Sequence, residues 1–258
     1  MLDTIFSQKQ IRRDPESLQI WGKDWTNGYP VDPSVIVFPE TIEQVQELVG
    51  YAISEGLKLV PSGGRTGLSG GAVASNSEVV VSFDRMNKIL DYSAKDRIVT
   101  CQPGLVTANL QAFARDQGLY YPVDFASSGS SQIGGNVATN AGGIKVIRYG
   151  LTRDWVAGMK VVTGTGALLD CNAGLVKNAT GYDFRHLLVG SEGTLGLMCE
   201  LDMRLAPMPE PQSVMVVGVP QVADLLNILH AFSDQITLSA FEFFSDLALT
   251  TAHAHRDL

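Results

Sequence analysis

Short apolar runs and one helical period predict a βαβ-type unit near the beginning of the chain. Residues 35 to 38 are a short apolar run that predicts a strand, and residues 57 to 60, apolar except for Lys58, predict a second one. Between them, residues 42 to 53 carry apolar side chains three and four positions apart, as on one face of a helix. Thr41 and Gln44 have the spacing of a capping box at the start of this helix. Glycine follows at its end, where a left-handed residue is favoured.

The same reasoning predicts four further elements before residue 170. Residues 79 to 83 predict a buried strand, and residues 97 to 102 predict another. Residues 107 to 117 predict a helix, with Thr107 as its N-terminal cap and a glycine directly after its end. Residues 155 to 169 place apolar pairs on both sides of a Gly-Thr-Gly sequence, which predicts a hairpin.

The two ends of the chain differ from this middle part. The first 29 residues predict a lead-in that Trp21 and Trp25 anchor to the body. Three prolines within residues 207 to 211 mark a domain boundary. Beyond it we expect a small α/β unit, residues 211 to 258, that has no glycine-rich loop. Its predicted elements are strands at 214 to 219 and 238 to 244, a helix at 222 to 232, and a second helix from residue 246.

Three stretches rich in glycine and small polar residues carry the candidate chemistry: residues 61 to 71, 121 to 150 and 177 to 197. Glycine lets a backbone approach a ligand closely, and consecutive free N–H groups form concave anion-binding surfaces. Between Phe125 and Ile144 there is no charged side chain, yet interspersed apolar residues argue against a flexible linker. We therefore expect these stretches to lie along a large cofactor, with a pyrophosphate at the first of them.

None of the three stretches fits a common nucleotide-binding or hydrolase motif. The first lacks the Lys-Ser/Thr pair of a P-loop and the acidic residue that follows a Rossmann loop. The alternative interpretation of the first stretch is a glycine-rich hairpin between strands. The hydrolase motif Gly-x-Ser-x-Gly would require glycine at Val189, two positions before Ser191. We predict no catalytic acid, base or metal ligand within the chain.

The net charge limits the classes of binding partner, and the cysteine content indicates the cellular compartment. Nineteen Lys and Arg residues against 27 Asp and Glu residues give a net charge of −8, which argues against nucleic acid and anionic membranes as partners. No apolar run reaches the roughly 18 residues of a membrane span, and the N-terminus lacks a signal-peptide pattern. Three widely spaced cysteines predict buried thiols in a reducing cytoplasm.

In order and spacing, the glycine-rich stretches resemble the FAD-linked oxidase family, whose FAD-binding domain is of the p-cresol-methylhydroxylase type (PCMH-type). The matching segments are residues 61 to 71, 133 to 143, 148 to 150 and 180 to 196. Within the family, the sequence is most similar to the D-2-hydroxyacid dehydrogenases, a branch that acts on D-2-hydroxyglutarate, D-lactate or glycolate. The resemblance implies an α+β fold in which residues 30 to 207 form a two-lobed FAD domain and residues 211 to 258 begin a substrate domain.

The resemblance also implies which residues hold FAD between the lobes, about 30 to 90 and 91 to 207. The pyrophosphate loop would be Pro61, Ser62, Gly63, Gly64, Arg65, Thr66, Gly67 and Leu68. The rest of the cofactor would be lined by Asp124, Gly129, Ser130, Ile133, Gly134, Gly135, Asn136, Thr139, Asn140, Gly142, Gly143, Tyr149, Gly150, Gly190, Glu192, Gly193, Leu195 and Gly196. Some relatives attach FAD through a histidine in the first loop; that loop has none here, which implies non-covalent FAD. Lys145 and Arg148 are candidates for a basic group near the flavin.

The activity that the resemblance implies is hydride transfer from a small 2-hydroxyacid to flavin N5. Quinone, an electron-transfer flavoprotein and a cytochrome are all expected as possible electron acceptors, and a homodimer is left open. The family's substrate and metal residues lie in the substrate domain and beyond, so we expect this chain to hold the FAD-binding part and to be inactive alone. The alternative is an FAD-binding or electron-transfer subunit without its own substrate site. A reductase of peptidoglycan precursor synthesis matches the motifs poorly.

Overall fold

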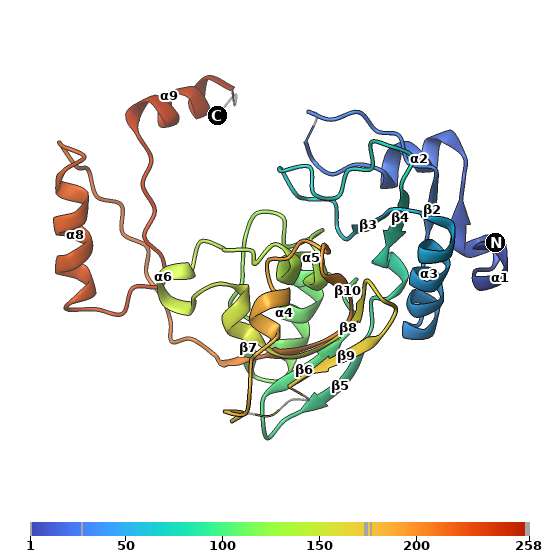
Figure 1. The fold of residues 1–258 in the computed structure, drawn as a ribbon. Coiled ribbons are helices and arrows are strands. Elements are labelled where there is room, and N and C mark those ends of the chain that lie inside the picture. Colours follow the sequence, from blue (N-terminus) through green and yellow to red (C-terminus); the bar gives the residue numbers. More distant parts are fainter. Residues whose placement is uncertain (1, 27, 173–174, 176, 256–258) are drawn as a thin grey trace.

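The chain folds into two packed lobes followed by an extended C-terminal segment (Figure 1). The computed structural model describes residues 2–26, 28–172, 175 and 177–255. Both lobes combine a sheet with helices, and the C-terminal segment carries two helices that stand apart from the lobes (Figure 1). The expected mixed α+β architecture is therefore confirmed.

The first lobe is built on a four-stranded sheet with the order β1-β2-β4-β3. Strands β2, β4 and β3 are parallel, and β1 is antiparallel to β2. Helix α3 packs on one face of the sheet together with α1, while α2 packs on the other. Both α1 and α2 come from the expected lead-in. The elements are α1 (Leu2–Ile5), β1 (Ile11–Arg12), α2 (Pro15–Trp21), β2 (Val35–Val37), α3 (Ile42–Glu55), β3 (Leu59–Ser62) and β4 (Val79–Ser82), with 3₁₀ helices at Gln8–Gln10 and Phe83–Arg85.

The second lobe is an antiparallel sheet with the order β5-β6-β10-β8-β9. Helices α4 and α5 supply Leu110, Ile133 and Val137 to the core on one face. A two-stranded pair, β7 with β11, accompanies this sheet. The elements are β5 (Ile89–Ser93), β6 (Ile98–Cys101), α4 (Thr107–Asp116), β7 (Leu119–Tyr120), α5 (Ile133–Ala138), α6 (Val146–Tyr149), β8 (Val156–Thr163), β9 (Leu168–Cys171), α7 (Arg185–Leu188), β10 (Gly196–Arg204) and β11 (Ala206–Pro207), with a 3₁₀ helix at Thr152–Trp155.

A shared apolar core fixes the two lobes against each other. Val162 and Leu197 of the second sheet pack in the same buried cluster as Val45 of α3. The side-chain amide of Gln46 on α3 also donates to the carbonyl oxygen of Gly166, in the β8–β9 turn, at 2.9 Å. These contacts therefore fix the position of the two lobes relative to each other on either side of the groove.

The ends of the predicted helices are partly as expected. Thr41 Oγ1 accepts from the backbone N–H of Gln44, and Gly56 ends α3 with φ of 67°. The other half of the predicted capping box is wrong by one residue, because Gln44 Oε1 accepts from the N–H of Glu40. Thr107 is not the cap of α4: it is the first helical residue, and its hydroxyl is occupied by Ser131.

Two side chains that were predicted to pack against the body, Trp25 and Ile53, are exposed in the structure. Trp21 is held as expected, because its indole N–H donates to Asp84 Oδ2 at 2.7 Å and its ring meets Phe38 edge-on. Trp25 is 74% exposed, so the prediction that it anchors the lead-in is wrong; its backbone N–H makes the attachment instead, to Gly67. Ile53 was expected on the buried face of its helix but is 58% exposed.

The C-terminal segment, residues 208 to 255, contains α8 (Asp224–Ser233) and α9 (Asp246–His255). Both helices were predicted. The strands predicted at 214 to 219 and 238 to 244 are wrong, since neither run forms a strand. No residue of the segment is buried. A strand needs a neighbouring strand to satisfy its backbone groups, and neither run is paired with one in the described structure.

Candidate functional site

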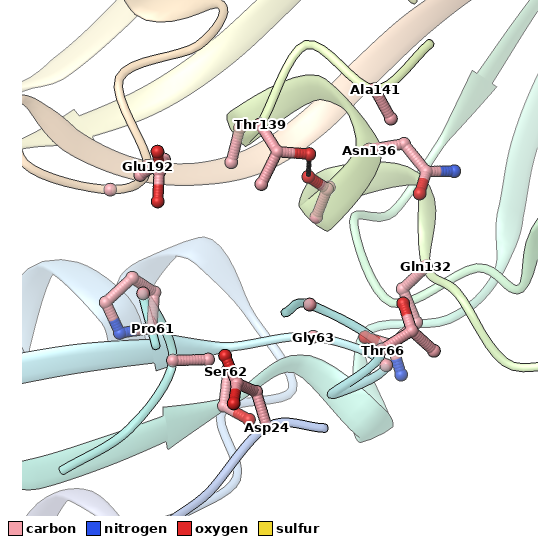
Figure 2. A pocket seen from close by; sticks show the side chains of 18 of the residues that line it. Asp24, Pro61, Ser62, Gly63, Thr66, Gln132, Asn136, Thr139, Ala141 and Glu192 are labelled. Atoms are coloured by element: carbon pink, nitrogen blue, oxygen red, sulfur yellow. Dashed lines mark hydrogen bonds between the residues drawn. The ribbon is translucent and has the colours of Figure 1, made fainter. Parts of the chain in front are cut away.

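A cavity of about 640 Å³ lies in the groove between the two lobes, and all three glycine-rich stretches contribute to it. Figure 2 shows Pro61, Ser62 and Gly63 of the first lobe facing Thr139 and Glu192 of the second. The first lobe contributes the loop after β3. The second contributes α5, the loop that follows it, and the start of β10. A cavity of this volume is in the usual range for sites that hold small molecules and cofactors.

The loop after β3 presents a run of unused hydrogen-bond donors. Within the described structure, the backbone N–H groups of residues 64 to 69 donate to no protein acceptor. Ser62, at the end of β3, is fully buried, and its hydroxyl also has no partner. Backbone donors in folded proteins normally find partners. Consecutive free N–H groups of this kind match the oxygens of a phosphate.

The glycines around the cavity have two different tasks. A β-carbon on Gly64 would lie 2.2 Å from the carbonyl oxygen of Ser130, and one on Gly193 would lie 2.3 Å from the ring of Pro61. At these positions glycine lets the two lobes touch. A β-carbon on Gly135 would meet nothing within 4 Å, so this glycine instead leaves open space at the cavity.

Residues of the N-terminal lead-in form hydrogen bonds with the first glycine-rich loop. Asp24 is buried, lines the cavity and accepts from the backbone N–H groups of Thr26 and Gly70. The N–H of Trp25 donates to the carbonyl oxygen of Gly67 at 2.9 Å. These contacts hold the loop in one conformation, which reduces the conformational entropy lost on ligand binding.

Backbone strain is concentrated at the cavity. Among the described non-glycine residues, positive φ angles occur at six positions, and three of these line the cavity: Arg65 at 58°, Asn140 at 48° and Glu192 at 51°. Non-glycine residues seldom adopt this conformation, and sites of function often contain it. The backbone N–H of Glu192 donates to Ala138, and the Asn140 side chain accepts from the backbone of Arg153, so neighbouring segments hold these two strained residues.

The charged side chains that line the cavity provide no excess of positive charge. Arg65 lines the cavity, but its guanidinium is paired with Asp84 at 3.3 Å. Asp24 and Glu192 also line it, as acids. An anionic group bound here would therefore be held largely by backbone N–H groups.

Lys145 and Arg148 do not line the cavity. The ammonium of Lys145 lies 2.6 Å from Tyr120 Oη and 3.3 Å from Asp124 Oδ2. Burial works to lower the pKa of Lys145, but the hydrogen bonds to Tyr120 and Asp124 raise it above its ordinary value overall. The guanidinium of Arg148 lies against the ring of Tyr149. The suggestion that one of these residues supplies a basic group near the flavin stays a prediction.

Most of the site residues predicted from the sequence come together at the cavity. Those that line it are Pro61, Ser62, Gly63, Gly64, Arg65, Thr66, Gly67, Leu68, Gly134, Gly135, Asn136, Thr139, Asn140, Gly142, Glu192, Gly193 and Gly196. Those that do not are Asp124, Gly129, Ser130, Ile133, Gly143, Tyr149, Gly150, Gly190 and Leu195. Several of the latter shape the walls: Ile133 lies in the core, and Gly143 packs on the backbone of Asp124.

Other lining residues were missed by sequence reasoning. They are Asp24, Ser69, Gly71, Ala72, Phe83, Pro103, Phe125, Ser127, Gln132, Ala138, Ala141, Leu197 and Met198. Gln132 and Ala141 lie inside a stretch that the sequence had already marked, so the stretch as a whole was the better guide. Asp24 and Phe83 carry no local signal, because only folding brings their elements to the groove.

Comparison with known proteins identifies the family. The model of the FAD binding domain family matches residues 33–172 of the chain. The chain belongs to this family. Its cofactor is FAD, as the resemblance implied. The matched residues include the first glycine-rich loop and the central stretch, which lie on opposite sides of the cavity.

Curated relatives are D-2-hydroxyglutarate dehydrogenases. The protein of that name from Stutzerimonas stutzeri (strain A1501) is 58% identical over 257 residues, covering 100% of this chain and 55% of the relative. The mitochondrial protein of that name from Rattus norvegicus is 35% identical over 250 residues, covering 95% of this chain and 47% of the relative. The chain thus spans about half the length of the curated relatives that it matches.

Solved structures share the fold. An alkyldihydroxyacetonephosphate synthase is 25% identical with a TM-score of 0.73, covering 81% of this chain and 40% of the other. The 6-hydroxy-D-nicotine oxidase from Arthrobacter nicotinovorans is 20% identical with a TM-score of 0.70, covering 89% and 49%. The expected PCMH-type α+β fold is therefore confirmed.

The residues at the cavity fit the chemistry of FAD. The free N–H groups of residues 64 to 69 and the unpaired Ser62 hydroxyl suit a pyrophosphate. The open space at Gly135 leaves room for a flat or extended ligand. Among the described residues there is no cluster of three or more potential metal ligands. No described helix has the length and apolar character needed to cross a membrane.

Proposed function

We propose that this chain is the cofactor-binding part of an FAD-dependent dehydrogenase of a D-2-hydroxyacid. The observation that carries the proposal is the cavity between the lobes, where a run of free backbone donors meets the glycine-rich stretches that match the family. The 58% identity to a D-2-hydroxyglutarate dehydrogenase supports this substrate class. D-2-hydroxyglutarate, D-lactate and glycolate are the substrates to compare.

We infer that residues 30 to 207 hold FAD without a covalent bond, and that residues 211 to 258 begin the substrate domain. FAD, when bound, supplies an acceptor for the hydride that leaves the α-carbon of the hydroxyacid. Residues 62 to 69 hold the pyrophosphate, and the α5 side of the groove holds the remainder. Lead-in contacts through Asp24 keep the loop in its binding conformation. No described residue is proposed as the catalytic acid or base.

The partners follow from the same proposal. The electrons taken from the substrate pass to an external acceptor, for which a quinone, an electron-transfer flavoprotein and a cytochrome are the candidates. The three cysteines are free and buried, which supports a reducing compartment such as the cytoplasm. A homodimer is the oligomeric state to test by size-exclusion chromatography.

The visible spectrum of the purified chain with added FAD tests the proposal. We expect flavin absorption to remain with the protein on desalting, to be released by denaturation, and to stay unbleached with D-lactate, glycolate or D-2-hydroxyglutarate. Retention after denaturation would contradict non-covalent binding. A failure to retain FAD at all would contradict the cofactor site.

A second function is favoured by the state of the C-terminal segment. Residues 208 to 255 bury no side chain, so in this chain they form no substrate pocket of their own. An FAD-binding or electron-transfer subunit that relies on another polypeptide for its substrate would look the same. Bleaching of the flavin by a hydroxyacid only when the longer polypeptide is expressed would favour the dehydrogenase; bleaching only with a separate subunit would favour the alternative.

A further inference from the structure

Asp84 lies just after β4 and receives hydrogen bonds from three separate parts of the chain. Trp21 Nε1 of the lead-in donates to Oδ2 at 2.7 Å, and Arg65 of the first glycine-rich loop is paired with the carboxylate at 3.3 Å. Gln132, directly before α5 in the second lobe, donates from Nε2 to Oδ1 at 2.7 Å. Asp84 therefore joins both sides of the groove and the lead-in through one carboxylate.

The carboxylate dictates which way the amide of Gln132 faces. An ionised carboxylate only accepts hydrogen bonds, so Gln132 must turn its NH₂ group toward Asp84. Its carbonyl oxygen, Oε1, is thereby directed to the other side. That oxygen is buried and has no hydrogen-bond donor among the described residues. A buried acceptor without a donor is unfavourable, so this oxygen indicates a group that the protein itself does not supply.

The surroundings of this oxygen indicate the missing donor. Gln132 lines the cavity, and Oε1 is 3.5 Å from the position that a β-carbon on Gly63 would take. It therefore lies beside the loop whose N–H groups suit a pyrophosphate. Phosphate oxygens are acceptors and cannot satisfy a carbonyl oxygen. In FAD the pyrophosphate is flanked on one side by the ribityl hydroxyls and on the other by the ribose hydroxyls, which can donate.

We propose that Asp84 is a positioning residue of the cofactor site, which holds Gln132 so that its Oε1 accepts a hydrogen bond from a sugar hydroxyl beside the FAD pyrophosphate. This inference rests on the proposed function, because it assumes that FAD occupies the cavity. It adds one residue that does not line the cavity, Asp84, and one specific contact, through Gln132. Asp84 acts on FAD only through the amide that it orients.

The test compares FAD dissociation constants, measured by quenching of flavin fluorescence, for D84N, Q132M and the D84N/Q132M double variant. The asparagine side chain in D84N can donate to Gln132 and so allow its amide to turn over, while the methionine in Q132M has no carbonyl oxygen. We expect each single variant to weaken FAD binding by about tenfold or more. The FAD dissociation constant of the double variant should lie within about threefold of that of the weaker-binding single variant, because both substitutions remove the same contact. D91N, at an exposed aspartate on β5, is the matched control and should bind as wild type.

A purely structural role would give a different result. If Asp84 only stabilised the fold, D84N would weaken FAD binding as much in the Q132M background as with Gln132 intact, and the two effects would multiply. That outcome would overturn the proposal, as would D84N binding FAD within twofold of wild type. Thermal unfolding of the FAD-free variants reports the stability change separately. Wild type that retains no FAD would instead contradict the proposed function itself.

Two further measurements complete the test. Displacement of FAD by FMN and by ADP distinguishes the two hydroxyl sources: Q132M should weaken FMN binding if the ribityl chain is the donor, and ADP binding if the ribose is. If D84N fails to fold, a crystal structure of the wild-type chain with FAD tests the proposed contact directly. A hydroxyl of FAD within 3.5 Å of Gln132 Oε1 would support the proposal, and no FAD atom at that distance would overturn it.

Discussion

Two apolar runs of the chain have similar sequences and opposite structures. Val-Val-Val-Ser at residues 79 to 82 is strand β4, fully buried, with parallel partners on both sides. Val-Met-Val-Val-Gly-Val at residues 214 to 219 forms no strand, and Val214 is 94% exposed. The difference shows that apolar, β-branched residues permit a strand, whereas neighbouring strands and a covering helix create it. The body, residues 2 to 207, has those neighbours, and the C-terminal segment does not.

A truncation in each region sharpens this comparison and should give the largest difference. Leu201 in β10 is fully buried, whereas Leu226 in α8 is 64% exposed. We expect L201A to lower the free energy of unfolding by about 2–5 kcal/mol, because it removes buried methyl groups and leaves a cavity. L226A should change it by less than about 0.5 kcal/mol. Urea denaturation followed by tryptophan fluorescence measures both; equal losses would mean that the segment packs on the body.

Asp24 tests whether the lead-in belongs energetically to the body. Its carboxylate is buried and accepts two backbone N–H groups, including that of Gly70. We expect D24A to cost about 1–3 kcal/mol of unfolding free energy, because both donors lose their acceptor. It should also weaken FAD binding, since the bond to the N–H of Gly70 helps to fix the first glycine-rich loop. D234A, at an exposed aspartate after α8, is the control; an equal effect of the two variants would contradict this view.

The smallest effect concerns pH. All three cysteines lie in the body; burial raises the pKa of Cys199 to about 12 and that of Cys101 well above its usual range. Folded thiols thus keep their protons while unfolded thiols, with a pKa of about 8.5, lose them. The stability that a buried thiol contributes to the folded state is therefore fully present below about pH 8.5 and is lost as the pH rises above it. We expect each buried thiol to remove about 1 kcal/mol of stability between about pH 8.5 and 9.5.

Denaturation of C199A across the same pH range checks this expectation. Removing one thiol should make the loss of stability with pH shallower than in wild type. A slope in C199A as steep as that of wild type would show that other groups cause the pH dependence. Helicity of the C-terminal segment, which has no cysteine, should not follow the same pH dependence.

The sequence predicted local elements well where they depend on neighbouring residues. The strand at β2, the helix α3 with its Thr41 cap and Gly56 end, and the β8–β9 hairpin were all readable from spacing. One error arose because a side chain served a distant partner. Thr107 could not cap its helix because its hydroxyl binds Ser131, a contact that joins residues far apart in the sequence.

The sequence by itself determined the glycine-rich stretches, their order and the family that they indicate, because these depend on residue type along a continuous loop. Only the tertiary structure decided which of those residues face the cavity. It also brought Asp24 and Gln132 to the same groove and placed Asp84 between Arg65 and Gln132. The physical reason is that hydrogen bonds and burial depend on distance in space, and folding alone sets that distance for residues tens of positions apart.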